Sequence, residues 1–248
     1  MKVAFVCLHY GSDYLGYAIK PIYDSVDKIV IAYASQPSHG HSTPLTNPDS
    51  RQACYDAAHM WGDPQNKIQW IDGNWKHEGL HRQIVWDLYP KANLISIVDA
   101  DEIWHPEQFA AVQEWCMTKP VRNFKQKLVT PWRSFNWLCT DEMRPDRFYR
   151  PDMPMNTIEY VPQEIGIYYH MGYAREPKHI EYKMSCHGHK CELKGNWFRD
   201  KYMAWSPTNN IGDLHPTCKD TWNAKPFDKN LLPTVLRSHP YWDKPIIE

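Results

Sequence analysis

Apolar residues recur along the first hundred positions in two alternating patterns. Short, nearly unbroken apolar runs occupy Val3–Cys7, Lys28–Ala34, Ile68–Ile71 and Leu94–Val98. Runs of this length predict strands that are buried on both faces, as in a parallel sheet. Between them, residues 14–26, 50–61 and 80–88 carry apolar residues at helical spacing. This alternation of strands and helices predicts a Rossmann-like half sheet with right-handed crossovers.

Local signals refine these predicted helices. Pro21 lies inside the first helical segment and should kink or shorten it. Asp49 or Ser50 should cap the second helix, which then runs to about Trp61. The chain has no Gly-x-Gly-x-x-Gly sequence, so the dinucleotide-binding fingerprint is missing.

Acidic residues follow the fourth apolar run at once. Asp99, Asp101 and Glu102 come directly after Leu94–Val98. In open α/β sheets, ligands bind beyond the carboxyl ends of the strands. Two aspartates separated by one residue in a turn can direct oxygen ligands at one hard divalent cation that also binds phosphate. The alternative is a solvated acidic turn that caps the next helix.

An Asp-x-Asp turn after a buried strand of an α/β chain resembles the metal-dependent glycosyltransferases of the A-type (GT-A) fold, in particular those like family 2. The resemblance covers roughly residues 1–190 and consists of architecture and two short motifs. It implies an α/β fold with a mostly parallel mixed sheet flanked by helices and a C-terminal extension. It also implies Mn²⁺ or Mg²⁺ at Asp99 and Asp101, with Glu102 orienting them or binding through water. The donor it implies is a nucleotide-sugar, with a UDP-sugar favoured, and Asp99 would also contact this donor.

A basic residue precedes the acidic turn on the predicted helix 80–88. Lys76 and Arg82 would lie near the beginning of this helix, where backbone donors and the helix dipole favour a phosphate. The resemblance gives Arg82 a contact with the sugar nucleotide. The alternative is a salt bridge from Arg82 to Glu78 at i, i+4 spacing.

The second motif spans Gly166–Arg175 and is followed by Lys183. An apolar strand that ends in His170, then Gly172, and a lysine on the next helix resemble the C-terminal part of several A-type families. The resemblance implies that His170 completes the metal site and that Lys183 contacts the diphosphate. An imidazole can add a ligand to Mn²⁺, and an ammonium offsets charge on a departing diphosphate. The alternative for His170 is a strand-end histidine bonded to the backbone.

An inverting sugar transfer needs a carboxylate or histidine that removes the acceptor proton. Asp141, Glu142 and Glu164 are the candidate catalytic bases, and the sequence does not rank them. Acidic residues in loops are also commonly just solvated.

The segment Cys186–Cys191 holds four possible zinc ligands in six residues. They are too close together to surround one tetrahedral ion, and no second pair follows at zinc-finger spacing. The alternative to a structural zinc site is that His187 or His189 lines a pocket beside the phosphates, and the sequence leaves both open.

The rest of the chain predicts an acceptor side. Pro106 should begin a helix that reaches Lys119, and strands are expected at Lys127–Trp132 and Phe135–Leu138. Trp197–Trp205 is expected to be helical. We expect one domain over residues 1–248, with a nucleotide-sugar-binding half at 1–105, an acceptor half at 106–208 and a wrapping tail at 209–248. The tail resembles those of small phage and bacterial transferases.

Composition limits the partners only loosely. A net charge of −1 gives no overall basic field for nucleic acid, although a local basic patch remains open. The acceptor hydroxyl could belong to a modified DNA base, a glycan, a lipid or a protein. The seven scattered cysteines and the lack of a long apolar run predict a cytoplasmic protein without a membrane span. Most of the twelve Trp and fifteen Tyr should fill the core, and the others are candidates for the lining of a sugar or base pocket.

Two other classes remain open at this stage. A nucleotidyltransferase would use the same sheet and metal but usually has a glycine-rich basic loop, which His9–Ser12 lacks. A non-catalytic carbohydrate-binding module would explain the aromatic residues without the Asp-x-Asp turn. Glycoside hydrolysis is less expected, because no separated pair of acids stands out.

Overall fold

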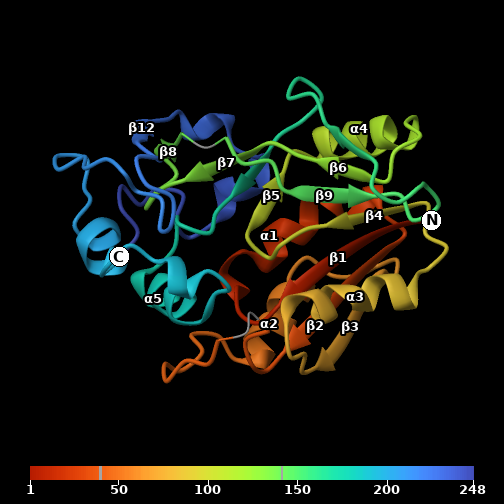
Figure 1. Ribbon diagram of the computed structural model, residues 1–248, viewed down its shortest axis with the longest axis horizontal. Coiled ribbons are helices and arrows are strands. Elements are labelled where there is room, and N and C mark those ends of the chain that lie inside the picture. The colour runs from red at the N-terminus through yellow and green to blue at the C-terminus, as the bar shows by residue number, and fades with distance from the viewer. Residues whose placement is uncertain (39–40, 141) are drawn as a thin grey trace.

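The computed structural model describes residues 1–38, 41–140 and 142–248. Within them, the main sheet has seven strands in the order β10-β6-β9-β4-β1-β2-β3 (Figure 1). Four of these strands are mutually parallel neighbours: β1 (Lys2–Leu8), β2 (Lys28–Ala34), β3 (Ile68–Gly73) and β4 (Leu94–Ile97). β9 (Asp146–Tyr149) is antiparallel to β4 and to β6 (Asn123–Lys125), and β10 (Ile158–Tyr160) is parallel to β6. The predicted mixed, mostly parallel α/β sheet is therefore confirmed.

Alternating side chains of the strands face helices on both sides of this sheet. Ala4 and Val6 of β1 share a core cluster with residues of α1 (Ser12–Ile22), α2 (Arg51–His59) and α4 (Pro106–Met117). Val3 and Phe5 point the other way and pack with Val85 of α3 (Glu78–Leu88). Because successive side chains of a strand point to opposite faces, an uninterrupted apolar strand needs cover on both.

The helix boundaries follow the local signals. α1 contains Pro21 and ends at Ile22, where the short 3-10 helix η1 (Tyr23–Ser25) continues, so the expected shortening is confirmed. The Ser50 side chain accepts a hydrogen bond from the backbone N–H of Ala53 and caps α2. Asp49, the other cap candidate, instead accepts hydrogen bonds at the beginning of α1.

A second sheet has five strands in the order β12-β8-β7-β11-β5. They are β12 (Ala224–Pro226), β8 (Trp137–Cys139), β7 (Leu128–Pro131), β11 (Tyr168–His170) and β5 (Glu102–Trp104). β5 begins directly after the acidic turn and pairs antiparallel with β11, so that Glu102 lies opposite His170. This pairing brings the two sequence motifs to one place.

The C-terminal part packs through aromatic rings. Four buried tryptophans form a separate core cluster with Tyr202: Trp132, Trp197, Trp205 and Trp222. Around them lie α5 (Pro177–Cys186), η2 (Lys190–Glu192) and η3 (Phe198–Met203); η3 is a π-helical turn where an ordinary helix was expected. The final segment contains η4 (Lys229–Leu231) and η5 (Thr234–Ser238) and adds Leu236 and Tyr241 to the main core. Among the described residues, no helix has both the length and the apolar character needed to cross a bilayer.

Candidate functional site

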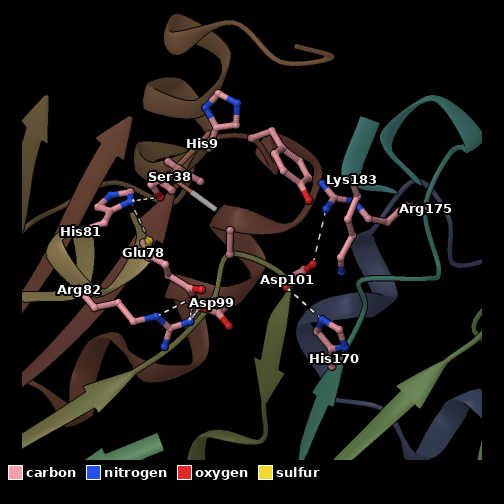
Figure 2. A pocket seen from close by; sticks show the side chains of 14 residues that line it. His9, Ser38, Glu78, His81, Arg82, Asp99, Asp101, His170, Arg175 and Lys183 are labelled. Carbon is pink, nitrogen blue, oxygen red and sulfur yellow. Dashed lines mark hydrogen bonds and ion pairs between the residues drawn. The ribbon is translucent and has the colours of Figure 1, made fainter. Parts of the chain in front are cut away.

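The acidic turn lies at the carboxyl end of β4, between the two sheets (Figure 1, Figure 2). The backbone N–H of Glu102 donates to the carbonyl oxygen of Asp99 at 3.0 Å, and the Glu102 carboxylate accepts from the Asp99 N–H at 3.2 Å. These two hydrogen bonds close the turn. Asp101 is 9% exposed, so this turn is not a solvated loop.

Asp101 and His170 face each other across the β5–β11 pair (Figure 2). The distance from Asp101 Oδ1 to His170 Nε2 is 3.7 Å. Burial opposes ionisation of this carboxyl, but His170, Lys183 and Arg175 outweigh burial and lower its pKa to about 2. Burial lowers the pKa of His170 to about 4, although the neighbouring carboxylate opposes this shift. At neutral pH the pair is therefore a carboxylate and a neutral imidazole.

This donor set fits a divalent cation. A separation of 3.7 Å is too long for a hydrogen bond but suits two ligands of one ion, each at about 2.1 Å. A neutral imidazole and an ionised carboxylate are also the protonation states that metal binding requires. The predicted metal ligands Asp101 and His170 are thus brought together.

Two cations, the buried Arg175 and the partly buried Lys183, lie beside this pair. The Arg175 guanidinium forms an ion pair with both carboxylate oxygens of Asp13 on α1, and its Nη1 lies 3.5 Å from Asp101 Oδ2. Lys183 reaches the same place from α5, with its Nζ 4.7 Å from the ring centre of Tyr173. Burial lowers the pKa of Lys183, while the Asp101 carboxylate opposes this shift. The sequence assigned no role to Arg175, although it ends the second motif.

Asp99 faces arginines. Its Oδ2 accepts a hydrogen bond from Arg147 at 2.9 Å, and its Oδ1 lies 3.5 Å from Arg82 Nη2. Arg82 also forms the i, i+4 salt bridge to Glu78, at 2.7 Å. The alternative of a salt bridge from Arg82 to Glu78 is therefore present, and Arg82 also lines the cavity at the acidic turn. Its contact with a sugar nucleotide stays a prediction.

Glu102 has an orienting role in this geometry. Its side chain is 1% exposed and accepts hydrogen bonds from Nε and Nη2 of Arg147 at 2.5 to 3.0 Å. Burial raises the pKa of Glu102 to about 7, and the Arg147 guanidinium opposes this shift. Arg147 is thereby fixed between Glu102 and Asp99. The sequence assigned Arg147 no role in the site.

A cavity of about 150 Å³ opens at the turn. The acidic and basic residues of the site that line it are Glu78, Arg82, Asp99, Asp101, His170, Arg175 and Lys183. The other lining residues are Cys7, Leu8, His9, Tyr10, Ser38, His81 and Ala100. The Nε2 of His81 donates to the Ala32 carbonyl at 2.7 Å, so its Nδ1 accepts from the Ser38 hydroxyl at 2.8 Å. The His81 ring stacks on Trp75 at 4.0 Å. His81 carried no sequence signal, because its partners come from other strands and loops.

A second cavity of about 790 Å³ adjoins the first, and His170 lines both. Glu142 lines this second cavity, with its side chain exposed and 2.9 Å from Lys127, which lowers its pKa. His187 and His189 line it as well. Glu164 is exposed in the turn before β11 and is not among the residues that line either cavity. Asp141 lies outside the described residues.

The fold and the site together define a class: an α/β chain with a mostly parallel sheet and a charged cavity at the carboxyl edge of its strands. No protein-family model matches the sequence. A search of curated proteins also finds no match.

Among solved structures, the chain is similar to Staphylococcus aureus TarS residues 1–349, described with UDP and with UDP-GlcNAc. The structure without nucleotide gives a TM-score of 0.44 at 11% identity and covers 74% of this chain and 63% of that one. Glucosyl-3-phosphoglycerate synthase from Mycobacterium tuberculosis, described with Mn²⁺, UDP-glucose and phosphoglyceric acid, gives 0.42 at 10% identity, covering 68% and 71%. Identities and TM-scores this low leave the site residues of this chain as the basis for its function.

Proposed function

We propose that this protein is a metal-dependent glycosyltransferase that moves a sugar from a nucleotide-sugar, with a UDP-sugar favoured, to an acceptor hydroxyl. The observation that supports the proposal most is the convergence of Asp101 and His170, 3.7 Å apart, inside a cavity lined by cationic side chains. Bound Mn²⁺ or Mg²⁺ would act as a Lewis acid and offset the charge of the diphosphate.

The chain's own residues have separate tasks in this proposal. Asp101 and His170 hold the cation. Arg82 and Lys183, together with the previously unassigned Arg175, line the same cavity and stabilise negative charge on the departing diphosphate. Asp99, held by Arg82 and Arg147, contacts the donor more readily than the metal, because both of its oxygens already face guanidinium groups.

In the transfer step, the bond between the anomeric carbon and the diphosphate oxygen breaks. A bond from the anomeric carbon to the acceptor oxygen forms, and the acceptor proton must go to a base. Of the three carboxylates predicted for this task, Glu142 lines the cavity that adjoins the metal pair. Its carboxylate is ionised at neutral pH, although the pairing with Lys127 that lowers its pKa also makes it a weaker base. We therefore retain Glu142 as the candidate base.

Asp101→Asn tests the proposal. A thermal-shift screen with UDP, GDP and dTDP should show that one diphosphate, with Mn²⁺, stabilises the wild-type protein, because ligands that bind only the folded state raise its stability. Asp101→Asn should lose this stabilisation and at least about 100-fold in metal-dependent release of nucleoside diphosphate from the donor, the order of loss typical for removing one electrostatic catalytic group.

The matched control is Asp87→Asn on α3, because this exposed carboxylate only accepts a hydrogen bond from Gln83. It should retain both signals. Release of pyrophosphate from a nucleoside triphosphate would favour a nucleotidyltransferase instead. Sugar binding that is unchanged in Asp101→Asn and independent of metal would favour a carbohydrate-binding module.

A further inference from the structure

The second cavity has the position of a binding site for the acceptor. It begins at His170, which also lines the smaller cavity at the acidic turn, and it extends past Leu128 of β7 and Thr140, the residue after β8, to the loop at residues 215–223. Its volume of about 790 Å³ lies in the range of about 300–1,000 Å³ that is usual for small-molecule sites. A molecule in this cavity would therefore end beside the proposed metal pair.

Aromatic rings form one wall of this cavity. Trp222 contacts Tyr173 edge-on at 5.0 Å and His215 at 4.5 Å between ring centres, and all three line the cavity. The Nδ1 of His215 accepts hydrogen bonds from the backbone N–H groups of Thr217 and Cys218, so the ring carries its proton on Nε2. Trp222 and Tyr173 are 5% and 7% exposed, so each offers a small apolar surface with a polar tip to a sugar ring, which has C–H faces and hydroxyl edges.

The backbone of this wall is strained. Trp222 has φ 59° and Asp220 has φ 58°, in the left-handed region that bulky side chains rarely adopt. Packing of Trp222 into the aromatic cluster with Trp132 and Tyr173 holds it in this conformation. Strained residues of this kind gather at ligand sites, where the surrounding structure fixes them.

The charges of this cavity are unfavourable for phosphate. Its charged lining residues, among those the structure describes, are four carboxylates and one guanidinium: Glu102, Glu142, Glu192, Asp220 and Arg147. The guanidinium is already bound by Glu102. Nucleic acids and anionic lipids owe much of their affinity to phosphate contacts with lysine and arginine. The lining therefore opposes a polyanionic acceptor and favours an uncharged one.

We propose that the second cavity, bounded by Leu128 of β7, Thr140 and the 215–223 loop, binds an uncharged carbohydrate, whose hydroxyl group is the acceptor. This inference rests on the proposed function and narrows its acceptor to a neutral glycan. Aromatic rings supply the apolar contact, and the carboxylates and imidazoles supply hydrogen bonds to hydroxyl groups.

The test is saturation-transfer NMR of the full chain with neutral oligosaccharides of the maltose, cellobiose and N-acetylglucosamine series, with and without UDP and Mn²⁺. At least one series should bind. Trp222→Ala should weaken binding at least tenfold. Because Trp222 is buried, Met143→Arg is a second variant: Met143 is 50% exposed and lines the cavity, so it can be replaced without disturbing the core. It should also weaken binding, whereas Met155→Arg, which is 74% exposed and outside both cavities, should not.

Parallel samples contain a single-stranded oligonucleotide or anionic phospholipid vesicles. The inference is overturned if these bind and the oligosaccharides do not, if nothing binds, or if Met143→Arg binds oligosaccharide as well as Met155→Arg does. The thermal shift by UDP and Mn²⁺ is measured in the same samples. A retained shift without oligosaccharide binding removes only this inference. Oligosaccharide binding without a shift removes the proposed transferase activity and the acceptor role with it, and leaves carbohydrate binding alone.

Discussion

At the scale of single residues, Gly172 lies where a side chain would displace the site. A Cβ atom added there would lie 2.5 Å from His170 Nε2 and 2.7 Å from Lys183 Nζ. Both distances are well below van der Waals contact. Because Gly172 has no side chain, the His170 imidazole and the Lys183 ammonium can both lie next to Asp101.

Gly172→Ala should weaken Mn²⁺ and UDP binding at least about tenfold, which corresponds to about 1.4 kcal/mol. The displaced atoms are the ends of two side chains, so the unfolding midpoint without ligand should change little. Isothermal titration with Mn²⁺ and UDP, combined with thermal unfolding, measures both effects.

Gly166→Ala is the control with the opposite pattern. Its Cβ would lie 2.9 Å from Val112 Cγ2, inside the packing of α4. It should lower the unfolding midpoint and leave ligand affinity unchanged. If Gly172→Ala binds Mn²⁺ and UDP as the wild type does, the positioning role of this glycine is wrong.

The site residues that the sequence predicted carry a local signal, whereas the site residues that it missed depend on partners far away in the sequence. Asp101 and His170 each sit at the end of an apolar strand, which is a local signal. Arg147 and Arg175 act through partners that lie 45 and 74 residues earlier, Glu102 and Asp101. No local pattern shows such pairings, because Arg147 reaches Glu102 from β9, which pairs with β4, and Arg175 follows β11, which pairs with β5.

At the scale of elements, α1 receives its N-terminal cap from a distant segment. The Asp49 carboxylate accepts hydrogen bonds from the backbone N–H groups of Gly11 and Ser12 at 2.6 and 3.1 Å, and from the Ser12 hydroxyl at 2.7 Å. Burial opposes ionisation of Asp49, but the hydrogen bonds from His179, Gly11 and Ser12 outweigh burial and hold its pKa well below the usual range. The carboxylate thus connects the start of α1 to the segment before α2.

Asp49→Asn should reduce the free energy of unfolding at neutral pH by about 1–3 kcal/mol, because one buried donor loses its partner. A carboxyl with a lowered pKa stabilises the folded state above its unfolded pKa of about 3.9 and loses this contribution as pH falls further. The difference between wild type and variant should therefore shrink below about pH 4.

Urea unfolding at neutral and acidic pH gives these free energies. The exposed carboxamide variant Asp87→Asn should match the wild type throughout. A gap between wild type and Asp49→Asn that stays constant with pH would rule out an ionised cap.

The elements found from sequence are those that carry their own signal. β1 to β4 are buried on both faces, so each shows an apolar run. β5, β6 and β10 have three residues each and were not predicted, because their strand geometry comes from pairing with β11, β9 and β6, respectively. The tryptophans expected in the core lie there. Their arrangement in the C-terminal cluster depends on contacts between residues that are far apart in the sequence.

At the scale of the whole molecule, His239 joins the C-terminal segment to α1. Its ring stacks on Tyr14 at 4.5 Å, its Nε2 donates to the Asp13 carbonyl at 2.9 Å, and its Nδ1 accepts from the Tyr241 N–H. Burial lowers the pKa of His239 to about 4. Asp13 also binds Arg175, so the end of the chain contacts the residue that supports the site.

This buried histidine makes stability depend on pH. The unfolded chain takes up the proton near pH 6.5, whereas the folded protein does so near pH 4, so the free energy of unfolding falls as pH drops between these values. The full effect is about 3 kcal/mol. His170 contributes in the same direction.

His239→Gln keeps a donor for the Asp13 carbonyl and removes the titration. It should flatten the fall in stability by about half across the range from about pH 6.5 to about pH 5, as measured by denaturant unfolding at closely spaced pH values. An unchanged slope would mean that the His239 imidazole is protonated in the folded protein.

The pairing of β5 with β11 has a consequence for biosynthesis. Asp101 emerges from the ribosome dozens of residues before His170 does, so a nascent chain carries one of the two proposed metal ligands long before it has the other. Binding of the metal ion would then require that β11 has already paired with β5. In a refolding experiment, manganese uptake should follow sheet closure and lag behind the first collapse of the parallel strands.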